Sequence, residues 1–80
     1  MATVMHADLT LDCKNLLCPM PIIKISQALK QIGIGQTILM ETTDPGSTHD
    51  VAAWARQTGN ELLETQPEGR VYRFLVRRLR

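Results

Sequence analysis

The spacing of apolar residues predicts a strand followed by a helix early in the chain. Residues 8–12 alternate between polar and apolar side chains like a half-buried strand, whereas apolar residues in 21–32 recur every three or four positions. Pro21 suits the first turn of this helix. We expect Gly33 to end it, because glycine readily takes the left-handed conformation that closes a helix.

The middle of the chain repeats this order. Residues 36–42 are typical of a largely buried strand, and residues 44–47 form a strong turn signal. A second helix is predicted from residue 47 or 48 to residue 58. Ser47 is expected to cap its first turn, with Asp50 as a shorter substitute for the glutamate of a capping box.

The last part of the chain predicts a β-hairpin. After Gly59, which can end the second helix, residues 61–65 and 70–76 are typical of strands on either side of a turn at residues 67–69. The element order is then βαβαββ, and two right-handed crossovers place both helices on one face of a four-stranded mixed sheet. We expect an α+β fold, a two-layer α/β sandwich formed by one domain over residues 1–80. The last strand is the most apolar and is expected in the middle of the sheet.

Cys18 is the strongest candidate for chemistry, because the sequence Cys18-Pro19-Met20-Pro21 lies between the first strand and the first helix. A proline restricts the residue before it, so Cys18 and Met20 are predicted to lie outside the α region. Unpaired N–H groups and the helix dipole favour a thiolate at such a position. Pro19 and Pro21 lack an N–H, so we predict only a moderate activation. The remaining donors are the amides of Met20, Ile22 and Ile23.

Asp44 is a second candidate, because of where its turn should lie. If the first two strands are parallel, the Cys18 turn and residues 43–46 emerge at the same carboxyl edge of the sheet. The two loops should then be neighbours, and Asp44 would orient the Cys18 loop or a partner. The alternative is a local role for Asp44 in an Asx turn before the second helix.

Length and composition limit the class of protein. A chain of 80 residues makes a small core, so we expect a shallow site rather than a large internal cavity. Two cysteines are too few for a disulfide-rich scaffold, residues 1–6 lack the features of a leader peptide, and no apolar run is long enough to span a membrane. The expected protein is soluble and cytoplasmic.

Charge is unevenly distributed along the chain. The formal net charge is +1, yet residues 1–69 carry four basic and eight acidic groups, and residues 70–80 carry five arginines and no acid. Such segregation suits an anionic partner or a docking surface. The alternative is a final strand whose arginines keep a small protein soluble and protect an edge.

Several motifs together resemble the TusA/SirA-like family of small sulfur-carrier proteins, over nearly the whole chain. The four letters of Cys-Pro-x-Pro are a weak signal alone, but length and element order match as well. The motifs are Leu11-Asp12-x-x-x-Leu16-x-Cys18-Pro19-x-Pro21, then Asp44-Pro45 after the second strand, then Tyr72-x-Phe74 in the closing strand.

The resemblance implies a role for Cys18. In this family the corresponding cysteine carries sulfur as a persulfide, or as a thiosulfonate in sulfur oxidisers, and passes it to a cysteine of a partner protein. Pro19 and Pro21 would shape the site, and Lys24 would face a partner or attract an anionic sulfur substrate, unless it is only a solvated charge. The implied partners are a cysteine desulfurase, a rhodanese or DsrE/TusD-like proteins, and no cofactor is expected. The pathway, whether tRNA thiolation, molybdenum-cofactor supply, selenium metabolism or sulfur oxidation, stays open.

Other interpretations remain at this stage. Cys18 could be a buried, inert residue, or the chain could be a regulatory or nucleic-acid-associated module with a structural or redox-sensing Cys18. Nucleic acid is not the expected partner, because no aromatic residue that is expected to be exposed alternates with the arginines. Cys13 is predicted to be a packed free thiol, although a Cys13–Cys18 disulfide is open. No zinc spacing is formed by the cysteines with His6 and His49.

Overall fold

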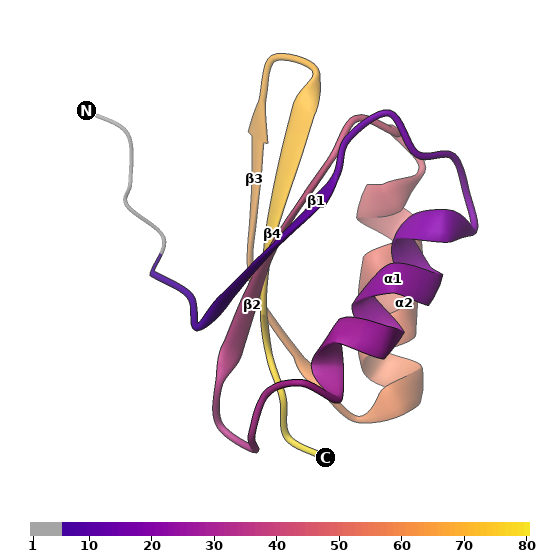
Figure 1. Cartoon of the computed structure of the whole chain (residues 1–80). Coiled ribbons are helices and arrows are strands. Elements are labelled where there is room, and N and C mark those ends of the chain that lie inside the picture. Colours follow the sequence, from indigo (N-terminus) through magenta and orange to yellow (C-terminus); the bar gives the residue numbers. More distant parts are fainter. Residues whose placement is uncertain (1–5) are drawn as a thin grey trace.

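The computed structural model describes residues 6–80, and these residues form the predicted α+β sandwich. The sheet order is β1-β2-β4-β3, with β1 parallel to β2 and the other neighbours antiparallel. Both helices cover one side of the sheet, and β4 lies inside it, as expected (Figure 1). The elements are β1 (Leu9–Cys13), α1 (Met20–Leu29), β2 (Thr37–Thr42), α2 (Ser47–Thr58), β3 (Glu61–Glu68) and β4 (Val71–Arg77).

The core fills the space between the sheet and the two helices. Alternate residues of the central strands point into it, so Met40 of β2 and Phe74 of β4 are completely buried, and α1 contributes Ile25. No helix among residues 6–80 is long and apolar enough to cross a membrane. Residues 1–5, which make up most of the segment expected to lack leader-peptide features, lie outside the described residues.

Helix α1 differs from the expected one at both ends. It begins at Met20, one residue earlier than expected, and ends at Leu29. The amides of residues 30–32 each bond to the carbonyl three residues earlier, which tightens the chain before Gly33. Gly33 donates to the Gln36 side chain at 2.6 Å, and the positive φ expected at Gly33 occurs at Gly35 instead (89°).

Helix α2 has the expected span, but the predicted cap at Ser47 is wrong. Gly46 occupies the cap position without a side-chain bond, and Ser47 is the first helical residue. The Ser47 hydroxyl is buried and bonds to the Asp44 carbonyl and the Thr42 hydroxyl instead. Gly59 ends α2 in the left-handed conformation, as predicted, with a φ of 73°.

The hairpin turn lies later than predicted. Strand β3 continues through Pro67 to Glu68, so Gly69 and Arg70 form the turn, with Gly69 at a φ of 64°. Pro67 pairs with Tyr72 of β4. A proline fits here because β3 is an edge strand, where a missing N–H need not interrupt the sheet.

Candidate functional site

The loop that carries Cys18 and the loop after β2 lie side by side, as predicted. Both loops follow the carboxyl ends of the parallel strands β1 and β2. The amide of Asn15 donates to the Thr43 hydroxyl at 2.9 Å and so connects the two loops directly. Asn15 has a positive φ of 66°, a conformation that asparagine tolerates better than most residues. This connection fixes the chain just before Cys18.

Cys18 is exposed immediately before α1, and both cysteines are free. The interpretation of Cys18 as a buried, inert residue is therefore wrong, and the Cys13–Cys18 disulfide is not formed. Pro19 is exposed at the cap position of α1, whereas Pro21 is buried in its first turn and anchors that turn on the core. The Cys18–Pro19 peptide bond is cis.

The electrostatic environment of Cys18 is opposite to the predicted one. Hydrogen bonding to the Asp50 side chain raises the pKa of the Cys18 thiol, and partial desolvation and the negative charges of Asp50 and Asp44 act in the same direction. A thiol in this environment is mainly protonated at neutral pH. The predicted moderate activation is therefore wrong.

The backbone explains why the start of α1 does not offset the rise in the pKa of Cys18. Met20 lies inside the helix rather than outside the α region, and its amide donates to the Leu17 carbonyl at 2.9 Å. The amide of Ile23 donates to the Pro19 carbonyl at 3.1 Å. Two of the three expected donors are thus used within the chain, which leaves little to stabilise a thiolate.

Asp44 has the local role in an Asx turn, and its predicted role in orienting the Cys18 loop or a partner stays a prediction. Its carboxylate accepts a hydrogen bond from the Gly46 amide at 3.0 Å, which is the Asx turn, and its charge also acts on Cys18. Lys24 is exposed on α1, where its charge acts on the buried Cys13 thiol and partly offsets the rise in pKa that burial causes there. The predicted role of Lys24 toward a partner stays a prediction.

Two features of the site were missed by sequence reasoning. The sequence pattern assigns Asp50 only to a helix cap, whereas the parallel topology puts the starts of α1 and α2 at one edge of the sheet and so brings Asp50 toward Cys18. The second feature is apolar exposure next to the cysteine. The exposed residues are Leu17 (76% exposed), Met20 (41%) and Ile23 (42%). Ile23 lies outside the buried face of α1. The helical spacing of the apolar residues could have predicted this exposure.

The remaining candidate residues are buried in the core or paired with other side chains of the fold. Cys13 is completely buried in the core, in agreement with its predicted packing. Arg73 pairs with Glu41 and Glu68, both at 2.8 Å, and Arg77 pairs with Glu61 at 3.6 Å. These pairs favour the structural interpretation of the arginines over a surface for nucleic acid. Within residues 6–80, no cluster of side chains suited to a metal ion is found.

Comparison with known proteins agrees with this arrangement. A model of the family described as sulfurtransferase TusA matches residues 9–78. The chain belongs to this family. The sulfur carrier protein TusA of Allochromatium vinosum is 42% identical over 71 residues, which cover 89% of this chain and 93% of that protein.

Two proteins of Bacillus subtilis extend the comparison. The putative sulfur carrier protein YrkI is 36% identical over 92% of this chain and 99% of its own length. The putative sulfur carrier protein YrkF is 43% identical over 94% of this chain, and the chain spans only 40% of YrkF. The crystal structure of a SirA-like protein from Desulfitobacterium hafniense has a TM-score of 0.78 over 90% of this chain and 99% of that one. At 20% identity, this likeness shows the fold.

Proposed function

We propose that this chain is a sulfur carrier that holds sulfur covalently on Cys18 and passes it to a cysteine of a partner protein. The observation that carries the proposal is an exposed cysteine at the strand–helix junction of a TusA-family domain. The relatives named as sulfur carriers support it. The residues that the family model matches would act as one carrier domain, with Pro19 and Pro21 holding the Cys18 loop at the start of α1.

The accessibility of Cys18 suits delivery to another protein. An open cavity of about 480 Å³ lies at the same edge of the sheet, but its lining residues do not include the cysteine. Cys18 instead lies on the surface beside Leu17 and Met20. A cysteine outside a pocket can enter the active site of a partner, and exposed apolar residues around it can pack against that partner.

The transfer is a thiol exchange without net oxidation. The Cys18 thiol loses its proton to solvent, and the thiolate attacks the outer sulfur of a persulfide on the donor cysteine. A new S–S bond forms on Cys18 while the S–S bond of the donor breaks, and the donor cysteine leaves as a thiolate. Delivery repeats this step with an acceptor thiolate attacking the outer sulfur on Cys18. Donors and acceptors such as a cysteine desulfurase, a rhodanese or a DsrE/TusD-like protein fit this chemistry; a thiosulfonate is the alternative cargo.

Intact-mass analysis tests the proposal directly. The protein is incubated with a cysteine desulfurase and cysteine, and we expect a gain of one sulfur atom that a reducing thiol removes. Cys13→Ser should gain the same mass, because Cys13 is buried. Cys18→Ser should gain none, because a hydroxyl cannot form the S–S bond. Sulfur accepted and delivered by Cys18→Ser, or an adduct on Cys13 alone, would refute the proposal.

A further inference from the structure

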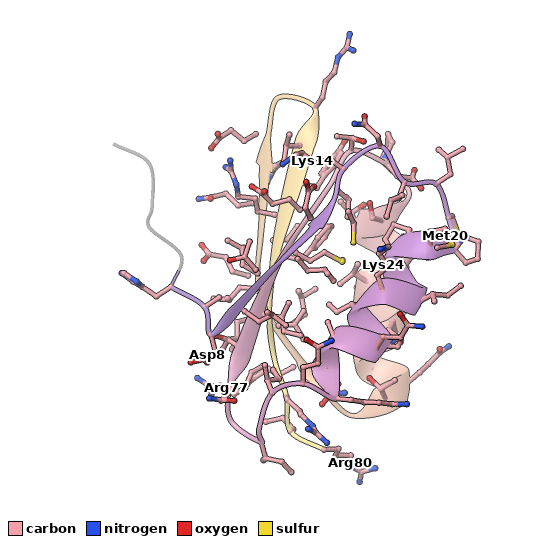
Figure 2. All side chains as sticks on the ribbon, viewed as in Figure 1. Asp8, Lys14, Met20, Lys24, Arg77 and Arg80 are labelled. Atoms are coloured by element: carbon pink, nitrogen blue, oxygen red, sulfur yellow. The ribbon has the colours of Figure 1, made fainter. Side chains whose placement is uncertain are left out.

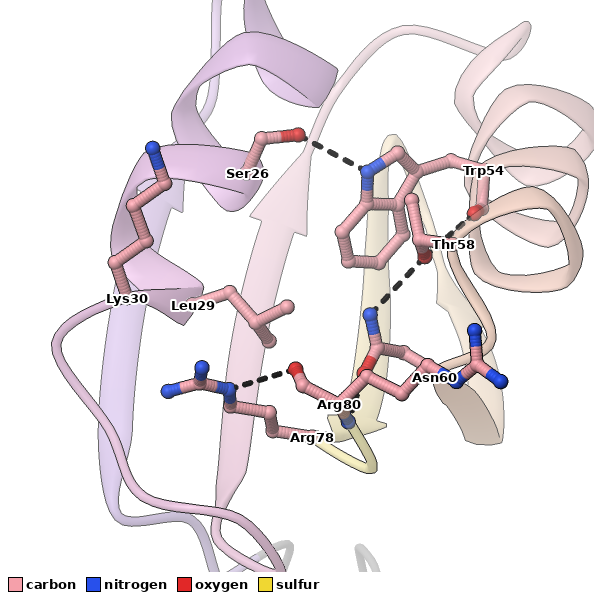
Figure 3. A pocket seen from close by; sticks show the side chains of 8 residues that line it. All are labelled: Ser26, Leu29, Lys30, Trp54, Thr58, Asn60, Arg78 and Arg80. Atoms are coloured by element: carbon pink, nitrogen blue, oxygen red, sulfur yellow. Dashed lines mark hydrogen bonds between the residues drawn. The ribbon is translucent and has the colours of Figure 1, made fainter.

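A second cavity lies at the opposite end of the helices from Cys18. It has a volume of about 220 Å³ and lies between the ends of α1 and α2 and the segment after β4 (Figure 3). The lining residues of α1 begin at Ser26, six residues after Met20, which corresponds to about 9 Å along the helix axis. The lining residues are Ser26, Leu29, Lys30, Trp54, Thr58, Asn60, Arg78 and Arg80.

The cavity combines an apolar inner surface with a few polar groups. Leu29 and Trp54 provide the apolar part. Trp54 donates its indole N–H to the Ser26 hydroxyl at 3.0 Å, so the hydroxyl hydrogen of Ser26 can point elsewhere. The side-chain oxygen of Asn60 already accepts from the amides of Leu79 and Arg80. The amide oxygen of Asn60 is therefore occupied, whereas the hydroxyl hydrogen of Ser26 is available to a ligand.

Three cationic side chains surround this cavity, and no lining residue is acidic. Arg78 has a structural role, because it donates to the carbonyl of Ile32 after α1 and to the carbonyl of Arg80. Lys30 and Arg80 are different: within residues 6–80, neither side chain makes a hydrogen bond or ion pair. No contact among the described residues therefore uses the charges of these two side chains.

The backbone makes room for Arg80 at the cavity. Gly59 has a φ of 73°, and a Cβ atom placed there would come within 2.9 Å of Arg80 Cδ. The stem of Arg80 thus lies directly on this glycine, and Figure 3 shows its guanidinium extending past Asn60, on the side of the cavity away from Lys30. Lys30 lies on the other side of the cavity, at the end of α1.

We propose that this cavity binds a small organic anion with an apolar body, such as a carboxylate attached to a single ring or a short branched chain. The apolar body packs on Leu29 and Trp54, and the positive charges of Lys30 and Arg80, which flank the cavity on opposite sides, attract the carboxylate. The volume is below the roughly 300–1,000 Å³ of sites for drug-sized ligands, which sets the limit of one ring. The site does not involve Cys18 and is independent of the proposed sulfur transfer.

The only tryptophan of the chain provides a direct readout. We would titrate the ¹⁵N-labelled protein with benzoate, phenylacetate and 4-methylpentanoate, and follow the indole N–H of Trp54 by NMR. At least one of them should shift this signal and the amide of Asn60, with a Kd of roughly 0.1–10 mM for so few atoms. Benzamide and inorganic sulfate separate the two parts of the ligand, because benzamide lacks the charge and sulfate lacks the apolar body. Both should bind at least about fivefold more weakly.

A matched pair of variants tests the assignment of the charges. Lys30→Gln/Arg80→Gln should weaken carboxylate binding at least about fivefold without changing the fold, since neither side chain has a partner within the described residues. Arg70→Gln removes an exposed charge from the hairpin turn at the other end of the molecule and should change Kd less than about twofold. Three results would each overturn the proposal: no carboxylate shifts Trp54, benzamide or sulfate binds equally well, or Arg70→Gln weakens binding as much as the double variant.

Discussion

Cys18 lies near acidic side chains, and this determines when it can react. The Asp50 side chain favours the protonated thiol through hydrogen bonding and charge, and the charge of Asp44 adds to this effect. A protonated thiol is a poor nucleophile, and two carboxylates also repel anionic sulfur compounds. The Cys18 thiol of the isolated protein is therefore expected to react slowly at neutral pH.

Asp50→Asn should therefore make Cys18 more reactive in the isolated protein. The raised pKa means that thiolate appears only as the pH rises through it, so removing the carboxylate should shift the pH profile of iodoacetamide labelling to lower pH. We expect the rate at about pH 7.5 to rise roughly two- to tenfold. Asp12→Asn is a suitable control, because Asp12 does not act on Cys18. Identical profiles for Asp50→Asn and the wild type would contradict this account.

The difference in exposure should affect the labelling rates of the two cysteines more than the difference in their pKa values. Cys18 is exposed, whereas Cys13 is completely buried and its burial raises the pKa of its thiol. Iodoacetamide should add one group to the folded protein and two groups in denaturant, as measured by mass spectrometry. The single group should persist in Cys13→Ser and disappear in Cys18→Ser. Labelling of both cysteines at similar rates in the folded protein would show that β1 opens readily.

At the scale of elements, hydrophobic spacing predicted where helices and strands occur, but not the hydrogen bonds at their ends. Residues 47–58 form the expected helix, yet Ser47 bonds to Asp44 and Thr42 rather than capping the helix. A hydroxyl can satisfy either role, and the choice depends on how β2 meets α2, which no local pattern contains. The same limit applies to Cys18: its place was predictable from the sequence, whereas its pKa depends on Asp50, 32 positions away along the chain.

The Ser47–Thr42 contact connects β2 to α2 and should contribute measurably to stability. The two hydroxyl oxygens are 2.6 Å apart, and both residues are buried. Ser47→Ala leaves the Thr42 hydroxyl without this partner and should cost roughly 1–3 kcal/mol in urea unfolding. The double variant Ser47→Ala/Thr42→Val removes both hydroxyls and should cost less than the sum of the single changes. Strict additivity would mean that the contact contributes nothing.

At the scale of the whole molecule, the helices cover one face of the sheet and charged residues cross the other. Figure 2 shows all described side chains, including Lys14 at one end of this charged face. Lys14 pairs with Glu41 at 3.2 Å, and Glu41 pairs with Arg73, which continues to Glu68. The chain of charges links β2, β4 and β3 to the residue that follows β1. Sequence analysis found the arginines but not their partners, because the strand register that aligns Glu41 with Arg73 depends on the complete sheet.

Glu41 lies at the centre of these charges, so its protonation should weaken the fold in acid. Hydrogen bonding to Arg73, and more weakly to Lys14, holds the pKa of Glu41 below its usual value of 4.5. A carboxylate with a lowered pKa contributes stability above its unfolded pKa and loses that contribution as the pH falls through the folded pKa. Glu41→Gln should reduce the free energy of unfolding by roughly 0.5–1 kcal/mol at neutral pH, and by less below about pH 4.

Urea unfolding of Glu41→Gln at about pH 7 and about pH 3.5 measures this difference. Glu64→Gln is the matched control, because Glu64 is exposed on β3 and makes no ion pair among residues 6–80. The control should have nearly the same free energy of unfolding as the wild type at both pH values. Since both variants lose one negative charge, a general effect of net charge would appear equally in each. If Glu41→Gln lost as much stability in acid as at neutral pH, the ion pairs would not be the cause, and the lost packing of the side chain would be the better explanation.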